Sequence, residues 1–213
     1  MKRSSKREAR RKRNNLIIGF TMIFLMLFSI LAFSIDSAFQ APVSFEFNGF
    51  EFSERIFFDD LIFFQDIRKY FTVIDGEEVS FYYPPGSMNQ VNVSSDNLSS
   101  LSRASFVYFS RAPVEQEEFN PNLIFFDILK LEFAENSFKN SRQGLTSHNL
   151  FESDLSIVTC SAANSNSFVF VLSNVSGMPS IKEIEPFCFE LIGSGENFLL
   201  LSDYLLYTVH GVI

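Results

Sequence analysis

The sequence predicts an α+β fold, a mixed α/β sheet covered by two helices, that follows a single N-terminal transmembrane helix. Three observations lead to this prediction. Residues 16–35 form an uncharged apolar run of 20 residues, two segments carry the Asn-Gly and Asp-Gly turns typical of β-hairpins, and strand-like and helical segments alternate in the second half of the chain. Hairpins need antiparallel pairs and a strand–helix–strand order permits a right-handed crossover, so a mixed sheet is expected.

The apolar run from Leu16 to Ile35 is expected to cross a membrane. Twenty helical residues at ~1.5 Å each span roughly 30 Å, the thickness of the hydrocarbon core. A cleaved signal peptide is an alternative, with Ala32-Phe33-Ser34 as a small-x-small site. The run exceeds the ~7–15 apolar residues usual in a signal peptide, so a retained anchor is favoured over cleavage and over a buried core helix.

Charge is divided unevenly along the chain. Residues 1–15 hold eight Lys/Arg and one acid, a charge of +7, whereas the remainder carries −15. Because basic residues beside an anchor stay in the cytoplasm, we expect a basic cytoplasmic tail (1–15), the anchor (16–35), a short linker (36–41) and a single extracytoplasmic domain (42–213) at the cell membrane. The acidic outer domain argues against binding of nucleic acid.

The outer domain is expected to begin with a Phe-lined hairpin, "FEFNGFEF". Asn48-Gly49 suits a two-residue type I′ turn, because both positions need a positive φ. This register places four Phe on a face that should be buried, and sets Glu46 opposite Glu51 on the other face. Two carboxylates are a thin ligand set, so a solvated face is favoured over a metal site at Glu46 and Glu51. No cofactor is expected.

The remaining elements are predicted in chain order. Residues 54–67 are dense in apolar residues without a clear period, so a short helix and two short strands both stay open. A second hairpin is expected around Asp75-Gly76, ended by Pro84-Pro85-Gly86, and residues 87–102 are expected to form a polar loop or a short helix. Strands are then expected at 104–110, 155–160, 168–172 and 187–193, a loop at 142–154, a helix from Asn120-Pro121 to about Lys139, and a last helix between Ser194 and Gly211.

The first of these helices places four polar residues on one face: Glu132, Glu135, Asn136 and Lys139. The second ends near His210, which the dipole of its own helix favours at that position without any ligand.

Two cysteines, Cys160 and Cys188, both fall in the expected outer domain. Thiols of an exported domain can pair, and closing a loop of about 28 residues would stabilise the fold by about 3–4 kcal/mol on the chain-entropy model. The alternative is two buried free thiols that act as small apolar residues. The disulfide is favoured. Neither cysteine belongs to a C-x-x-C pair, so redox catalysis and zinc binding lack the required spacing.

The sequence contains none of the common catalytic motifs: no G-x-S-x-G, H-E-x-x-H, Walker loop, G-x-G-x-x-G or EF-hand pattern. Acids cluster at Asp59-Asp60, at residues 115–118, and at Glu183 and Glu185. A glycosidase-like pair among them stays open, although clustered acids are expected in a domain of this charge. Sequons that would suit an outer surface begin at residues 92, 97 and 174.

Several segments resemble an uncharacterised group of membrane-anchored proteins from small-genome archaea. They are the basic tail with its anchor, "FNGFEF", "IDGEEVSFYYPP", "VTCSAANSNSFVFVL" and "FCFELIGSGENFLLLSDYLLYTVHGVI". The resemblance implies two cysteines that flank a Val-rich strand, and a C-terminal helix with an Asp-x-x-x-Tyr element, matched here by Asp203 and Tyr207. It implies no molecular function.

Together these features favour a non-enzymatic single-pass surface protein, whose outer domain binds a protein or a component of the cell envelope. Some of the 28 Phe could form the exposed patch that such binding uses. An exported carboxylate-based hydrolase is the first alternative. A pilin-like filament subunit is the second, although "RKRNNLIIGF" offers neither a pilin processing site nor a Glu near the helix start.

Overall fold

The structure is a computed structural model that describes residues 43–59, 65–95, 97–113, 121–137, 139–148 and 154–213, together with residues 21, 22, 24 and 26. The chain divides into two compact units, residues 1–42 and 43–213. The predicted tail, the predicted linker and most of the predicted anchor lie outside the described residues. The four described residues within the anchor are helical, and no helix among the described residues is both long and apolar enough to cross a membrane.

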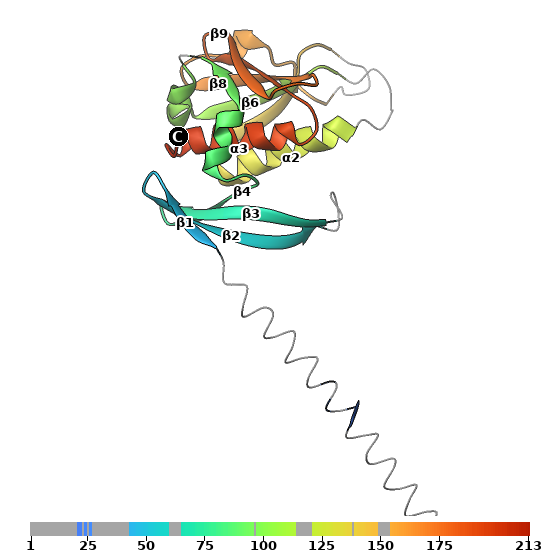
Figure 1. The fold of residues 1–213 in the computed structure, drawn as a ribbon. Helices are drawn as coiled ribbons and strands as arrows, with labels where there is room; N and C mark the ends of the chain where they lie inside the picture. The colour runs from blue at the N-terminus through green and yellow to red at the C-terminus, as the bar shows by residue number, and fades with distance from the viewer. Residues whose placement is uncertain are drawn as a thin grey trace, which may run out of the picture. The chain divides into compact units, whose positions relative to one another are not determined.

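The unit 43–213 is α+β and contains two sheets with helices between them (Figure 1). The first sheet is antiparallel, in the order β1-β2-β3-β4, with bounds β1 (Ser44–Phe47), β2 (Phe50–Asp59), β3 (Gln65–Ile74) and β4 (Glu77–Phe81). The second is mixed, in the order β5-β9-β10-β8-β6-β7, with bounds β5 (Asn92–Ser94), β6 (Phe106–Arg111), β7 (Asn140–Leu145), β8 (Ser167–Asn174), β9 (Ser180–Glu185) and β10 (Cys188–Gly193). The described residues of this unit also form the α-helices α2 (Pro121–Asn136) and α3 (Asn197–Val209). Their 3₁₀ helices are η1 (Pro85–Gln90), η2 (Leu98–Arg103) and η3 (Cys160–Ala162). The mixed α+β class is therefore confirmed, but the prediction of one sheet is wrong.

The two predicted hairpins are present, and they form a sheet of their own. Phe47 faces Phe50 and Phe45 faces Phe52, as the Asn-Gly turn predicts. Both turns have positive φ at their two central residues, 49° and 84° at Asn48-Gly49 and 53° and 89° at Asp75-Gly76. In the described part of the segment 54–67 the chain forms strands, because residues 54–59 belong to β2 and residues 65–67 belong to β3. A sheet built from consecutive hairpins needs no distant partner strand, so it can form without strands of the mixed sheet.

The six-stranded sheet contains three strands that the sequence analysis missed: β5, β7 and β9. The predicted loop from Arg142 is in part strand β7, which lies at the edge of the sheet beside β6. The predicted strand 155–160 is wrong, since this segment forms only a single bridge, between Ile157 and Leu145. It lies so close to β7 that a Cβ on Gly144 would be 2.5 Å from Val158 Cγ2. β5 and β7 are the edge strands of this sheet, and the polar sequence of β7 lacks the apolar alternation on which sequence prediction relies.

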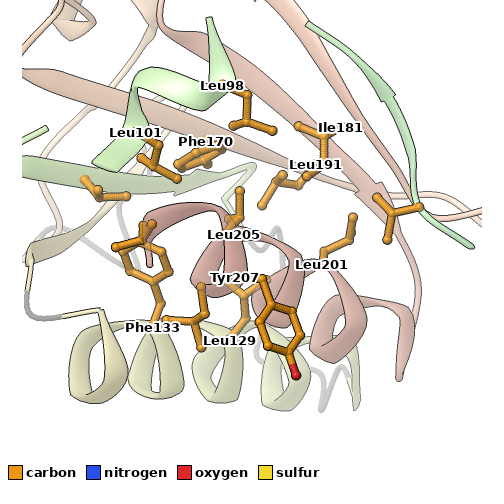
Figure 2. Packing of buried hydrophobic residues seen from close by; sticks show 14 of the residues in the cluster. Leu98, Leu101, Leu129, Phe133, Phe170, Ile181, Leu191, Leu201, Leu205 and Tyr207 are labelled. Atoms are coloured by element: carbon orange, nitrogen blue, oxygen red, sulfur yellow. The ribbon is translucent and has the colours of Figure 1, made fainter. Parts of the chain in front are cut away.

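The core is one cluster that includes side chains from both sheets and both helices. Its mixed-sheet part is a row of Phe rings across neighbouring strands: Phe109 stacks on Phe170 and Phe170 on Phe189, with centroids 5.6 and 5.4 Å apart. Figure 2 shows Phe133 and Leu129 of α2 and Leu205 of α3 filling the space beneath the sheet. The Phe surplus of the sequence thus supplies mainly the core.

Helix α3 is enclosed between the sheets. Ten of its 13 residues are buried, among them Ser202 and Asp203. The mixed sheet covers one side, and on the other side Tyr207 stacks on Phe81 with ring centroids 4.1 Å apart and contacts the edge of Phe52. Of these two buried polar side chains, Asp203 accepts a hydrogen bond through Oδ2, whereas Ser202 Oγ and Asp203 Oδ1 have no hydrogen-bond partner within the described part of the chain.

Candidate functional site

Asp203 and Tyr207 hold the peptide groups of a single residue, Tyr83, at the end of the four-stranded sheet. One turn apart on α3, they lie on the same face of the helix. The backbone N–H of Tyr83 donates to Asp203 Oδ2 at 2.7 Å, and the Tyr207 hydroxyl donates to the carbonyl oxygen of Tyr83 at 2.7 Å. We call this arrangement the Tyr83 clamp. It fixes the chain where it leaves β4, just before Pro84-Pro85-Gly86.

Burial is the main cause of the pKa shifts of the two side chains in the clamp. Asp203 is 1% exposed, and its burial raises the pKa of the carboxyl group well above its ordinary value, while the Tyr83 N–H acts in the opposite direction and nearby Glu132 raises the pKa further. Burial also raises the pKa of the Tyr207 hydroxyl. In both groups burial therefore favours the protonated, uncharged form. A fully enclosed acid with no exposed face can join two elements, but it cannot act on a substrate from solvent.

The polar face of α2 meets the four-stranded sheet. Glu132 Oε1 accepts hydrogen bonds from Lys69 Nζ at 2.8 Å and from the Tyr82 hydroxyl at 2.9 Å. Asn136 Oδ1 accepts the backbone N–H of Ser80 at 3.0 Å, which occupies a donor of edge strand β4. The predicted polar face thus serves partly to attach the helix to the sheet.

The end of α2 departs from its prediction. The helix begins at Pro121 but ends at Asn136, so Lys139 lies beyond it. His210 Nε2 lies 2.7 Å from the carbonyl oxygen of Asn136, and its ring therefore contacts the C-terminus of α2 as well as ending α3. Burial lowers the pKa of His210, so the neutral imidazole is favoured.

The second candidate is an open pocket of about 420 Å³ at one edge of the mixed sheet. We call it the Glu183 pocket; it is lined by Ser94, Ser95, Asn97, Glu183, Ile184, Glu185 and Pro186. It contains two acids that the sequence analysis singled out, Glu183 and Glu185, together with hydroxyl and amide groups that could hydrogen-bond a polar ligand.

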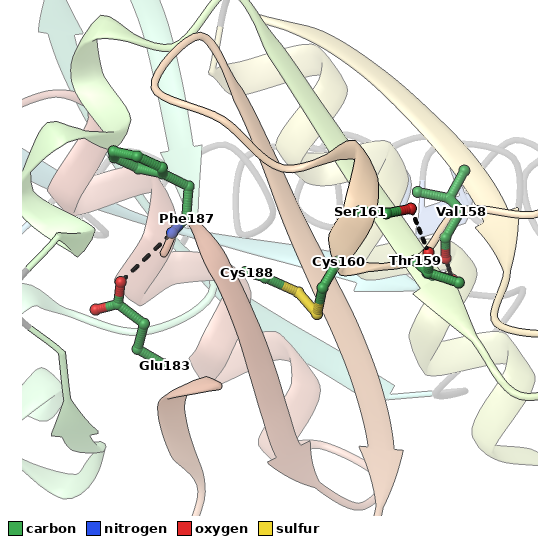
Figure 3. The surroundings of a disulfide bond; sticks show 8 residues. Val158, Thr159, Cys160, Ser161, Glu183, Phe187 and Cys188 are labelled. Atoms are coloured by element: carbon green, nitrogen blue, oxygen red, sulfur yellow. Dashed lines mark hydrogen bonds between the residues drawn. A yellow bond between two sulfur atoms is a disulfide. The ribbon is translucent and has the colours of Figure 1, made fainter. Parts of the chain in front are cut away.

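The carboxylate of Glu183 is already occupied by protein donors. It accepts hydrogen bonds from Ser95 Oγ at 2.9 Å and from the side-chain and backbone nitrogens of Asn97 at 2.5 and 3.4 Å. A further hydrogen bond comes from the Phe187 N–H at 3.4 Å (Figure 3). Burial raises its pKa, but the hydrogen bonds from Asn97 and Ser95 outweigh this effect, so that the net pKa is lowered. An ionised, hydrogen-bonded carboxylate secures η2 to the β9–β10 turn and is unsuited to serve as a general acid.

The predicted disulfide between Cys160 and Cys188 is confirmed (Figure 3). It joins η3 to the first residue of β10, and its Cα atoms are 5.3 Å apart. Cys188 and Cys160 pack with Val158 and Val169 in a small cluster separate from the main core. The disulfide therefore holds the segment after β7 against the second face of the mixed sheet.

Glu46 and Glu51 lie directly opposite each other and are exposed, as the hairpin register requires. Within the described ranges, no group of three or more His, Cys, Asp or Glu side chains is arranged to hold a metal ion. Of the other acid clusters, Asp60 and residues 115–118 lie outside the described residues.

Comparison of the chain with family models, curated proteins and solved structures found no match. The sites therefore rest on their own geometry. The sequence analysis singled out Asp203 and Tyr207 as an Asp-x-x-x-Tyr element but missed Tyr83. Tyr83 takes part in the clamp through its backbone N–H and carbonyl groups, which do not depend on the residue type and so cannot be recognised in a sequence. The i, i+4 spacing of Glu132 and Asn136 had placed both side chains on one face of α2, and this is the face that contacts the four-stranded sheet.

Proposed function

We propose that the protein is a single-pass membrane protein whose domain 43–213 lies outside the cytoplasm and binds a protein or envelope component without catalysis. The observation that carries this proposal is the Cys160–Cys188 disulfide. Disulfides persist in oxidising compartments and are rare in the cytosol. The disulfide agrees with the orientation that the basic tail and the apolar run of residues 16–35 favour, with the tail in the cytoplasm and the domain outside.

The roles of the candidate acids support a binding function over hydrolysis. A carboxylate-based hydrolase needs an acid with a raised pKa beside a site that the substrate can enter. Asp203 has the raised pKa but is 1% exposed, whereas Glu183 borders a pocket but has a lowered pKa. No described acid that was singled out combines both properties.

The orientation can be tested with two single-cysteine additions to the full chain. In the native protein both cysteines are consumed by the disulfide, so an added cysteine is the reporter. Met178→Cys places it on a side chain that is 69% exposed, and Ser4→Cys places it in the basic tail. Intact cells are treated with a membrane-impermeant maleimide, and lysed cells serve as the matched control.

We expect Met178→Cys to be labelled on intact cells and Ser4→Cys only after lysis. The reverse pattern would invert the topology. Labelling of both variants only after lysis would place the domain in the cytoplasm, and the proposal would then be abandoned.

A further inference from the structure

The four-stranded sheet is joined to the rest of the unit without a shared strand ladder. Its strands follow one another in the chain, from Ser44 to Phe81, and within the described residues none of them pairs with a strand of the mixed sheet (Figure 1). Buried side chains hold it instead, such as the stack of Phe81 on Tyr207, together with hydrogen bonds to the two helices. A sheet attached in this way can open as one unit while the remaining structure stays folded.

The Tyr83 clamp lies where this sheet continues into the rest of the chain. Tyr83 follows the last residue of β4, Phe81, by two positions, and both of its peptide groups are hydrogen-bonded to α3 at 2.7 Å. If β4 moves away from α3, the chain at Tyr83 has to leave Asp203 and Tyr207. Opening of the sheet at this end therefore requires release of the clamp.

The closed clamp encloses a carboxyl group with few partners. Asp203 is buried, its Oδ2 accepts the Tyr83 N–H, and its Oδ1 has no hydrogen-bond partner within the described residues. A charged carboxylate enclosed in this way lacks the donors that it needs, whereas a protonated carboxyl is neutral. Water supplies those donors once the clamp opens. The closed form thus favours the protonated acid, and the open form favours the ionised acid.

The charged groups around Asp203 leave this difference in place. Burial raises its pKa, and Glu132 of α2 acts in the same direction, while Lys69 of β3 and the backbone N–H groups of Tyr83 and Tyr82 act in the opposite direction with a smaller effect. Lys69 Nζ lies 2.8 Å from Glu132 Oε1, so its charge already has a partner. The surroundings of Asp203 therefore favour its protonated form.

The other titratable groups near the clamp have a different pH dependence. Burial raises the pKa of Tyr83 to about 12 and also raises the pKa values of Tyr70 and Tyr207, so these hydroxyls stay protonated where an ordinary carboxyl group titrates. Burial lowers the pKa of His210, which contributes a stability that increases with pH. A stability that decreases as pH rises from acid to neutral thus distinguishes Asp203 from His210.

We propose that the Tyr83 clamp is a proton-dependent switch: Asp203 holds the four-stranded sheet against α3 while it is protonated, and loss of this proton at rising pH releases the sheet as a unit. Release uncovers the aromatic side chains of Phe52, Phe81 and Tyr207, so the switch also determines when this apolar surface is accessible. The inference does not rest on the proposed function, because it requires neither the anchor nor a binding partner.

Proton linkage determines the sign and the size of the effect. In the open form Asp203 has the ordinary pKa of about 3.9, so above about pH 4 opening releases a proton. Each further pH unit then multiplies the ratio of open to closed molecules by about ten, for as long as the closed form keeps its proton.

Two matched cysteine variants report the opening of each sheet separately. Val79 in β4 and Val107 in β6 are both fully buried, and both native cysteines are consumed by the disulfide. Val79→Cys and Val107→Cys therefore each place one free thiol in the core, on the four-stranded and on the mixed sheet. The full chain in detergent is treated with a pyridyl disulfide reagent at several acid to neutral pH values, and each rate is divided by that of the same variant unfolded in urea.

We expect the normalised rate of Val79→Cys to rise by about tenfold per pH unit, while that of Val107→Cys stays nearly constant. Addition of Asp203→Asn, which cannot ionise, should abolish the rise at Val79. Addition of Glu132→Gln, the neighbouring acid, should leave the rise in place.

Hydrogen exchange of the chain without added cysteines gives an independent measurement. The N–H groups of Ser80 and Tyr83 donate to Asn136 and Asp203 on the helices. After correction for the intrinsic effect of pH, their exchange should accelerate as pH rises, while that of β8 should not. Asp203→Asn should remove the acceleration.

Three results would each overturn the inference. Equal rises at Val79 and Val107 would show that the whole unit unfolds, and a rate at Val79 that does not change with pH would show that no switch exists. A rise that persists in Asp203→Asn would assign the switch to another group. If a cysteine variant does not fold, hydrogen exchange decides by the same three criteria.

Discussion

The Tyr83 clamp and the Glu183 pocket both use a carboxyl group to hold backbone N–H groups, yet their pKa values move in opposite directions. Asp203 is fully enclosed and its Oδ2 accepts the Tyr83 N–H, so burial dominates and the pKa rises. Glu183 receives donors from Ser95, Asn97 and Phe187 beside an open pocket, so hydrogen bonding dominates and the pKa falls. The comparison shows that the balance between desolvation and donor number, rather than residue type, decides whether the pKa of an acid rises or falls.

The largest effect is expected from Phe81→Ala, which removes the apolar support beneath the clamp. Phe81 is fully buried and stacks on Tyr207. Loss of a buried Phe costs about 3–5 kcal/mol of unfolding free energy because a cavity remains. Phe57→Ala, at a half-exposed position, is the control and should cost about 0.5 kcal/mol or less in detergent solution. Urea unfolding of the solubilised full chain measures both, and equal losses would contradict the assignment of the core.

The next effect concerns the disulfide, whose Cys188 follows directly on a residue that donates to Glu183. The double variant Cys160→Ala, Cys188→Ala should lose about 3–4 kcal/mol of unfolding free energy, since the unfolded chain is no longer constrained by the closed loop. Reduction of the native protein should produce the same loss, measured by urea unfolding with and without dithiothreitol. If reduction leaves the midpoint unchanged, the disulfide does not constrain the fold.

The comparison itself is tested by Asp203→Asn and Glu183→Gln measured across pH. The folded pKa of Asp203 is raised, so its favourable contribution is complete below the unfolded pKa, about 3.9, and is lost as pH rises toward the folded pKa. Asp203→Asn should therefore remove a decline in stability above about pH 4. The folded pKa of Glu183 is lowered, so its contribution is present above about pH 4.3 and is lost as pH falls.

Glu183→Gln should accordingly cost about 1 kcal/mol at pH 7, the scale of one net hydrogen bond to a partly solvated carboxylate, and less at acid pH. Thermal or urea unfolding at several pH values checks the two variants. Curves that change with pH in the same direction would show that burial does not separate the two acids.

An effect similar in size to that of Glu183→Gln is expected from Tyr207→Phe. The variant keeps the ring contacts with Phe81 and Phe52 but loses the hydroxyl that donates to the Tyr83 carbonyl. The expected loss is about 0.5–1.5 kcal/mol, measured by urea unfolding, and the pH dependence set by Asp203 should persist. A pH profile as flat as that of Asp203→Asn would instead mean that the clamp acts as one titrating unit.

Local features of the sequence predicted much of this fold correctly. The Asn-Gly and Asp-Gly turns determined two hairpins, and Asn48-Gly49 determined the register of the first to the residue. Asn120-Pro121 located the start of α2, and the apolar segment at the C-terminus located α3. These features act over a few residues, so the sequence contains their cause.

The tertiary structure alone decided the rest. β7 is a polar edge strand whose partner β6 precedes it by more than 25 residues, and the other edge strand, β5, pairs with β9 across a still longer separation. The two sheets separate because α3 inserts its apolar sides between them. Tyr83 joins the clamp through its backbone, which every residue possesses. The sequence by itself therefore determined the turns, the two cysteines and the Asp-x-x-x-Tyr element. The positions where distant chain segments meet depended on packing between elements far apart in the chain, and so did the direction in which the pKa of Asp203 and of Glu183 moves.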